Sequence, residues 1–149
     1  MLVVCNGNIF RSPFAAAVLR RVLGQSGVAV DSGGFVGPGR ASPPEAVAAA
    51  ARRGIDLRGH RSQLLMPDLV RAADVILVMD TAQRRMICER FGRPPQDVLL
   101  LSDFDPAPIE SRTIDDPWEQ GPHVCEVVYG RIEDCIGSFA RALRSVAMR

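Results

Sequence analysis

The chain contains no lysine, so all 18 of its basic residues are arginines. They are balanced by 17 acidic residues, and a formal net charge of +1 gives no reason to expect a nucleic-acid partner. No apolar run approaches the ~20 residues that cross a membrane, so we expect no membrane partner either. A hydrophobic content of 47% is ordinary for a globular protein, which argues against extensive disorder.

The four cysteines fit neither a zinc pattern nor a disulfide framework, and no C-x-x-C motif is present. If Cys125 and Cys135 share a helix, a rise of ~1.5 Å per residue separates them by roughly 15 Å, too far for a disulfide. We therefore expect reduced thiols, no metal, no cofactor and a cytoplasmic protein. Met1 precedes Cys5 so closely that we expect no signal peptide.

Short β-branched runs alternate with longer helical patterns along the chain. Runs of Val, Ile and Leu are typical of a parallel sheet buried on both faces, and alternating strands and helices predict a three-layer α/β/α fold. At 149 residues, we expect a single domain over residues 1–149. The expected strands are Leu2–Val4, Val28–Asp31, Val75–Met79 and Val98–Leu101, and the expected helices are Pro13–Leu23, Pro44–Arg53, Asp68–Ala72, Ala82–Phe91 and Pro122–Val146.

Two irregular stretches, Ser32–Pro43 and Ser102–Pro122, directly follow expected strands. Loops at the carboxyl ends of parallel strands line the ligand crevice of such sheets. We therefore expect both stretches to meet the loop after the first strand at one edge of the sheet.

That first loop, Cys5-Asn6-Gly7-Asn8-Ile9-Phe10-Arg11-Ser12, is here called the Cys5 loop. A cysteine followed after five residues by Arg-Ser, between a strand and a helix, is typical of a loop that wraps backbone N–H groups around a phosphate. A helix N-terminus favours an anion through its free N–H groups and its dipole. The same field favours the nucleophilic thiolate form of Cys5.

Each residue type in the Cys5 loop suits phosphoryl transfer. Cys5 is the candidate nucleophile, and the planar fork of Arg11 can hold two phosphoryl oxygens into the transition state. Gly7 and Asn8 tolerate the left-handed backbone that turns successive N–H groups inward. Ser12 can donate to the Cys5 sulfur, although it is also an ordinary helix-start residue. The competing interpretation is a turn of small residues around an inert buried cysteine.

A departing phenolate or alkoxide needs a proton, and the Asp/Pro-rich stretch is where we expect its donor. Asp116-Pro117-Trp118 combines a carboxyl group, a stiffening proline and an indole that can flank a planar ring. Asp105-Pro106 is a comparable dipeptide, and Asp-Pro is common in turns. Residue chemistry alone therefore leaves Asp116 and Asp105 as equal candidates, with Asp103 and Asp115 close by.

Through these motifs the chain resembles the low-molecular-weight protein tyrosine phosphatases over nearly its whole length. The resemblance implies a four-stranded parallel sheet flanked by helices, and it selects Asp116 over Asp105 as the general acid. Besides Cys5–Pro13, the matching segments are Ser32-Gly33, Gly54-Ile55-Asp56-Leu57, Gly59-His60-Arg61, Ala73-Asp74, Val78-Met79-Asp80, Asp103-Phe104-Asp105-Pro106 and Asp116-Pro117-Trp118.

The resemblance also implies a two-step mechanism without a metal. Cys5 attacks phosphorus to form a phosphocysteine while Asp116 protonates the phenol, and Asp116 then activates the water that releases inorganic phosphate. The implied substrate is a phosphotyrosine-containing protein, for example a bacterial tyrosine kinase. Since a protonated acid and an ionised thiol must coexist, we expect activity to peak on the mildly acidic side.

The resemblance also implies further roles. Residues matching the network that supports the Cys5 loop are Asn8, Ser12, Ser32 and His60. Residues matching the substrate wall are Asn6, Phe35 and Trp118, with Val36 beside Phe35. Phe10 stands where the family usually has a second cysteine, so we expect oxidised Cys5 to lack a local disulfide partner.

Four other functions remain as alternatives. An arsenate reductase on this fold needs a close pair of further cysteines, and only Cys88 is available in that region. Relatives that act as protein arginine phosphatases tend to carry Thr where this chain has Ile9. A phosphocysteine carrier needs no Asp116, because it must keep its phosphocysteine from hydrolysis, and a non-catalytic phosphotyrosine reader has no reason to retain both Cys5 and Asp116.

Overall fold

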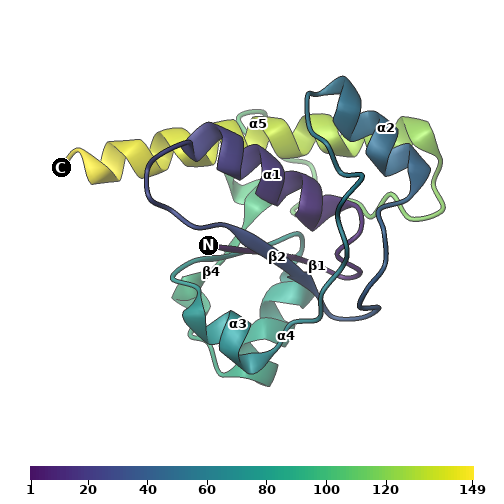
Figure 1. Cartoon of the computed structure of the whole chain (residues 1–149). Coiled ribbons are helices and arrows are strands. Elements are labelled where there is room, and N and C mark those ends of the chain that lie inside the picture. The colour runs from purple at the N-terminus through teal and green to yellow at the C-terminus, as the bar shows by residue number, and fades with distance from the viewer.

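The computed structural model, which describes residues 1–149, contains a four-stranded sheet in the order β2-β1-β3-β4 (Figure 1). Every neighbouring pair of strands is parallel, which confirms the expected fold class. The strands are β1 (Leu2–Cys5), β2 (Asp31–Gly34), β3 (Ile76–Val78) and β4 (Val98–Leu100).

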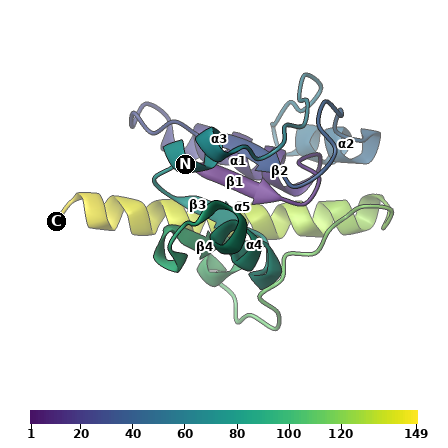
Figure 2. The same ribbon diagram turned by 90° about the horizontal axis from the view of Figure 1, so that it is seen from below.

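Helices cover both faces of the sheet. Helices α1, α2 and α5 lie together on one face, and α3 and α4 lie on the other (Figures 1 and 2). In both views the last turns of α5 extend beyond the other elements. No helix is long and apolar enough to cross a membrane. The helices are α1 (Arg11–Leu23), α2 (Pro44–Arg52), α3 (Pro67–Ala72), α4 (Thr81–Phe91) and α5 (Pro122–Ala147), with short 3₁₀ helices η1 (Pro95–Asp97) and η2 (Leu101–Phe104).

The pleat of the sheet divides the apolar core into two clusters. Successive strand side chains point to opposite faces, so Leu2 and Val4 pack in the smaller cluster with side chains from α3 and α4. Val3 and Cys5 belong to the larger cluster, which side chains of α1 and α5 complete. The side chain of Cys5 therefore lies on the face of the sheet that α1 and α5 cover.

The expected second strand, Val28–Asp31, was placed too early, because β2 spans Asp31–Gly34. The β-branched residues that suggested the earlier position do not pair, and Val28 is 39% exposed. The register with β1, from Leu2 opposite Asp31 to Cys5 opposite Gly34, decides the strand instead. A Cβ on Gly34 would lie 2.8 Å from the Asn6 carbonyl oxygen, so a glycine with low strand propensity is required there.

Candidate active site

A cavity of about 240 Å³ opens at the carboxyl end of β1, where the Cys5 loop leads into α1. Its walls come from three separate parts of the chain. This confirms the expectation that the loops after the strands meet at one edge of the sheet. The three parts are the Cys5 loop, the Val36–Arg40 loop after β2, and the segment Ile114–Trp118, here called the Asp116 segment. The lining residues are Cys5, Asn6, Gly7, Ile9, Phe10, Arg11, Val36, Arg40, Asp116 and Trp118.

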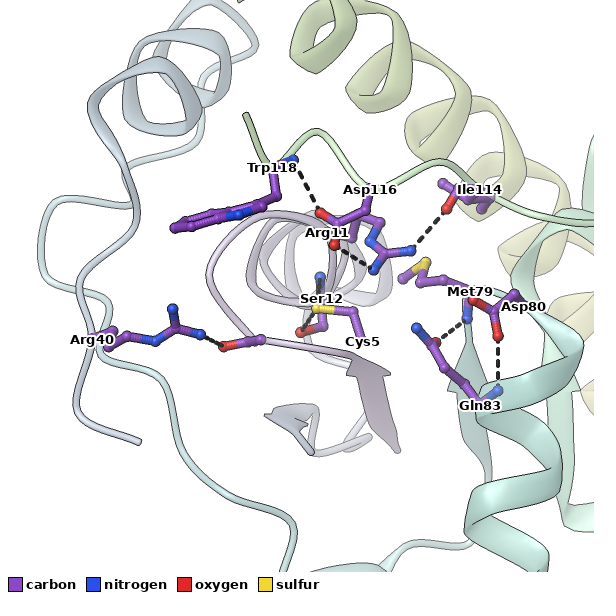
Figure 3. A network of polar contacts seen from close by, with 11 residues as sticks. Cys5, Arg11, Ser12, Arg40, Met79, Asp80, Gln83, Ile114, Asp116 and Trp118 are labelled. Carbon is purple, nitrogen blue, oxygen red and sulfur yellow. Dashed lines mark hydrogen bonds and ion pairs between the residues drawn. The ribbon is translucent and has the colours of Figure 1, made fainter. Parts of the chain in front are cut away.

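The sulfur of Cys5 lies 3.0 Å from the Ser12 hydroxyl oxygen and 3.4 Å from the Ser12 nitrogen (Figure 3). Two further bonds decide which way the hydroxyl proton points. The Gln63 N–H donates to Asn8 Oδ1 at 2.9 Å, so the other end of that amide is the donor, and Asn8 Nδ2 donates to Ser12 Oγ at 2.8 Å. The Ser12 hydroxyl is thus left to donate to Cys5, so the sulfur faces two donors, the hydroxyl and the backbone N–H of Ser12.

Asn8 is the centre of the support beneath the Cys5 loop. It is fully buried and its φ is 54°, a left-handed conformation that asparagine tolerates. Its amide also donates to Ser32 Oγ at 2.9 Å, and its carbonyl oxygen lies 2.6 Å from His60 Nε2. Because a carbonyl only accepts, His60 Nε2 carries the hydrogen. The structure thus brings together all four residues that the resemblance placed in the supporting network.

The expectation for Gly7 was wrong, because Gly7 is not among the residues with a positive φ. Its missing side chain matters for a different reason. A Cβ at Gly7 would lie 2.8 Å from Nη2 of Arg40, so the glycine leaves room for that guanidinium at the pocket.

Arg11 joins the Cys5 loop to the Asp116 segment. Its side chain is only 4% exposed, Nη1 donates to the Ile114 carbonyl at 2.9 Å, and Nη2 lies 3.3 Å from Asp116 Oδ2 (Figure 3). The N–H of Ile114 donates to the Met79 carbonyl at the end of β3, which fixes the segment to the sheet. Arg11 Nε is buried without a partner in the protein, a costly state that a phosphoryl oxygen would relieve.

The carboxylates of the Asp/Pro-rich stretch lie in different surroundings. Asp116 lines the cavity, is 43% exposed, and accepts a bond from the Trp118 N–H at 3.1 Å. Asp105 instead pairs with Arg131 of α5 at 3.0 Å and is 12% exposed. Asp103 pairs with Arg112, and Asp115 does not line this cavity. Of these four carboxylates, only Asp116 lies at the pocket of Cys5.

Aromatic side chains form one wall of the cavity. The indole of Trp118 is 47% exposed and meets the ring of Phe10 edge-on, with ring centroids 6.5 Å apart. Phe10 itself is 2% exposed, and its carbonyl accepts a bond from the buried Tyr129 hydroxyl of α5 at 2.8 Å. The wall is therefore anchored to the helix layer through Phe10.

The expected wall residue Phe35 does not line the cavity, which is a correction to the prediction. Phe35 packs against the smaller core cluster, with the Arg90 guanidinium 5.6 Å from its ring centroid. The register of β2 explains this, because Gly33 faces Leu65 of that cluster and Phe35 follows it by one period of the pleat. Val36, 49% exposed, lines the cavity instead, and Asn6 lines it as expected.

Sequence reasoning missed several residues of the site. Arg40 lines the cavity, Gln63 orients the Asn8 amide, and Tyr129 holds the Phe10 carbonyl. None belongs to a local motif, and each reaches the site through the tertiary fold. Only the position of Arg40 in a glycine-rich loop after a strand gave a signal that could have been used.

Burial separates Cys125, Cys135 and Tyr129 from this chemistry. It raises the pKa of Cys125 to about 11 and that of Cys135 to about 12, so both thiols stay protonated near neutral pH. Burial also raises the pKa of Tyr129 far above its ordinary value. No group of three or more His, Cys, Asp or Glu side chains is arranged to hold a metal ion.

The chain is similar to known phosphatases over nearly all of its length. A family model described as low molecular weight phosphotyrosine protein phosphatase matches residues 1–147. A probable low molecular weight protein-tyrosine-phosphatase, EpsP of Ralstonia solanacearum, is 37% identical over 147 residues, which are 98% of this chain and 97% of the relative.

Two solved structures are also similar to the whole fold. The tyrosine phosphatase Wzb from Escherichia coli K30, solved in complex with sulphate, gives a TM-score of 0.86 at 27% identity, over 95% of this chain and 96% of Wzb. The YwlE arginine phosphatase from Geobacillus stearothermophilus gives 0.87 at 29% identity, over 99% of this chain and 94% of YwlE.

Proposed function

The chain belongs to the low molecular weight phosphotyrosine protein phosphatase family, a family of hydrolases, and we propose that the pocket at Cys5 hydrolyses phosphotyrosine through a phosphocysteine. One observation carries the proposal. A cysteine sulfur with two donors, a buried arginine with an unpaired N–H and a half-exposed carboxyl group line the same cavity.

In the first step the Cys5 thiolate attacks phosphorus, and the bond from phosphorus to the phenolic oxygen breaks. Arg11 and the N–H groups of the Cys5 loop hold the other three oxygens as charge redistributes over them. Asp116 gives its proton to the departing phenolate, so that tyrosine leaves as a neutral phenol.

In the second step a water molecule attacks the phosphocysteine. Asp116, now ionised, takes a proton from that water, and inorganic phosphate leaves as the thiolate re-forms. The Ser12 hydroxyl supports the sulfur as a leaving group, because its hydrogen bond stabilises the returning negative charge. The exposure of Asp116 suits this exchange of protons with water.

The wall formed by Phe10 and Trp118 supports an aromatic substrate. Aromatic rings favour stacked or edge-on contacts, so a phosphotyrosine ring between Trp118 and Val36 gains contact that an alkyl phosphate lacks. We propose a phosphotyrosine-containing protein as the partner, with a bacterial tyrosine kinase as one example. All four cysteines are free, and on that ground we propose a cytoplasmic location.

The test is hydrolysis of an aryl phosphate by the wild type, Cys5→Ser and Asp116→Ala, with Asp103→Asn as a matched control. Asp103 belongs to the same Asp/Pro-rich stretch but pairs with Arg112 away from the cavity. We expect turnover by the wild type and Asp103→Asn, none by Cys5→Ser, and slow turnover by Asp116→Ala. Absence of wild-type turnover, or full activity of Cys5→Ser, would contradict the proposal.

Phosphoarginine is the second candidate substrate, because the YwlE arginine phosphatase shares this fold. Ile9, 6% exposed, lines the cavity with an aliphatic side chain and favours an aryl group over a guanidinium. Parallel assays of phosphotyrosine and phosphoarginine peptides separate the two substrates, and we expect a higher kcat/KM for phosphotyrosine.

Arsenate reduction is disfavoured by the arrangement of the thiols. Cys88 packs against the smaller core cluster, whereas Cys5 belongs to the cluster on the opposite face of the sheet. Cys88 is therefore not placed to relay a disulfide from Cys5. Arsenate-dependent thiol oxidation, measured beside aryl phosphate hydrolysis, tests this point.

A further inference from the structure

Arg40 brings a second cation to the active-site cavity. It lies at the end of the Val36–Arg40 loop and lines the same cavity as Cys5 and Arg11. Arg11 already has Asp116 as its counterion, but Arg40 takes part in none of the ion pairs of the structure. A positive charge at the cavity is therefore left without a carboxylate of the protein.

The guanidinium of Arg40 occupies a space that two glycines leave for it. A Cβ on Gly37 would lie 2.4 Å from Arg40 Nε, and a Cβ on Gly7 would lie 2.8 Å from Nη2. Nε donates to the Gly37 carbonyl at 3.1 Å. Nη2 approaches the Gly7 carbonyl at 3.4 Å, and Figure 3 marks this contact of Arg40 with a dashed line. The side chain is thus fixed between its own loop and the Cys5 loop.

The backbone around Arg40 is fixed as well. The Arg40 N–H donates to Ser62 Oγ at 2.9 Å, and the Ser62 N–H donates to the Arg40 carbonyl at 2.8 Å. The Ser62 hydroxyl donates to the Gly37 carbonyl, which also accepts from Arg40. Since most of the freedom of a long side chain is already lost, binding through this guanidinium carries a reduced entropic cost.

Several donors of Arg40 remain free. A guanidinium has five N–H groups, and the bonds above use one at Nε and one at Nη2, which leaves three, namely both hydrogens of Nη1 and the second hydrogen of Nη2. A planar edge of this kind matches a carboxylate. The phosphoryl group has Arg11 and the Cys5 loop as its partners, so the ligand of Arg40 is a second anionic group.

We propose that Arg40 binds a carboxylate of the substrate next to the phosphotyrosine, so that the enzyme prefers acidic flanking residues. The inference rests on the proposed function, because it names a feature of the same substrate. Arg40 acts here on the choice of substrate, while Cys5, Arg11 and Asp116 carry the reaction.

The test compares phosphotyrosine peptides that carry either Asp or Asn at one position at a time. The positions are the two residues before the phosphotyrosine and the two residues after it. At one or more positions, we expect the wild-type kcat/KM to favour Asp about fivefold, the upper range for a pair near the surface. In Arg40→Gln we expect the ratio of the kcat/KM values for Asp and Asn peptides to fall to about 1, which means no preference. In the wild type we expect the preference for Asp to shrink in high salt, which screens the ion pair.

Arg61→Gln is the matched control. Arg61 pairs its backbone with Ala41, beside Arg40, but it is exposed and does not line the cavity. Removing it takes away the same charge from the same region, and the preference for Asp is expected to persist.

Hydrolysis of para-nitrophenyl phosphate, which has no flanking residues, keeps the two proposals apart. If the wild type does not hydrolyse it, the proposed function fails. If it does, but the Asp preference is missing or survives in Arg40→Gln, the inference about Arg40 is wrong. If Arg40→Gln lowers kcat/KM equally for para-nitrophenyl phosphate and both peptides, Arg40 acts on the phosphoryl group and the inference is again wrong.

Discussion

The two sides of the cavity are built in opposite ways. Below Cys5, the buried polar groups of Asn8, Ser12 and Ser32 bond to one another and fix the nucleophile. Across the cavity, Asp116 is 43% exposed, and its carboxylate contacts only Arg11 and the Trp118 N–H. The difference matches the two tasks, because a nucleophile benefits from a fixed position whereas a general acid must exchange protons with water.

Arg11→Lys attacks the contact between the two sides and is expected to have the largest effect. Lysine loses the planar fork and leaves the Ile114 carbonyl without its donor. We expect kcat for an aryl phosphate to fall about a thousandfold. The control is Arg131→Lys, because Arg131 also bonds a carboxylate and backbone carbonyls near this segment but lies outside the cavity. Equal losses in both variants would contradict a specific role for Arg11.

Asp116→Asn removes the proton donor and leaves the cavity shape intact. For a phosphotyrosine peptide we expect kcat to fall about a hundredfold, with a smaller fall for para-nitrophenyl phosphate, whose leaving group needs less help. Asp105→Asn breaks the pair with Arg131 instead, so it is expected to lower stability by about 1 kcal/mol with little change in kcat.

Asn8→Ala tests the buried side. It removes the amide that donates to the Ser12 and Ser32 hydroxyls, and because both hydroxyls are buried, water does not replace the lost donor. It also forces alanine into a φ of 54°. We expect the free energy of unfolding to fall by about 2 kcal/mol and kcat by roughly tenfold. Ser32→Ala removes only one partner and is expected to cost less on both measures. A fully stable and active Asn8→Ala would show that the network does not hold the Cys5 loop.

The buried thiols of Cys125 and Cys135 are expected to have the smallest effect, a change in the free energy of unfolding that is small near neutral pH. The folded-state pKa values of Cys125 and Cys135 are raised from 9.0 to about 11 and about 12, so the folded state holds these protons more tightly than the unfolded state. Their contribution is complete below pH 9 and is lost as the pH rises toward 11 or 12. Urea unfolding is therefore expected to show little change from pH 7 to 8.5 and a steep loss above pH 9.5, roughly 1.4 kcal/mol per thiol and pH unit.

Alkylation at pH 8 compares the reactivity of Cys5 at the cavity with that of the buried Cys125 and Cys135. Cys5 is expected to react quickly and to be protected by inorganic phosphate, while Cys125 and Cys135 react only after unfolding. Mass spectrometry of the modified peptides identifies the residues. Rapid modification of Cys125 in the folded protein would show that burial does not control its reactivity.

Most of the fold follows from local patterns. All five α-helices and strands β1, β3 and β4 lie within one or two residues of the expected positions, because periodicity and prolines near helix starts are local signals. Strand β2 was misplaced, since its Asp-Ser-Gly-Gly sequence has little strand propensity. The position of β2 is decided by its pairing with β1 and by the close approach of Gly34 to the Asn6 carbonyl.

The sequence by itself determined the α/β fold class and the Cys5 loop. Both depend on residues close together along the chain, whose spacing sets the local backbone conformation and its hydrogen bonds. Tertiary structure alone decided which of the remaining side chains face the cavity. It takes Asp105 away through Arg131 on α5, turns Phe35 to the other face of the sheet, and brings Arg40 against Gly7. Those outcomes depend on partners distant in sequence and on strand register, and neither is encoded in a local pattern.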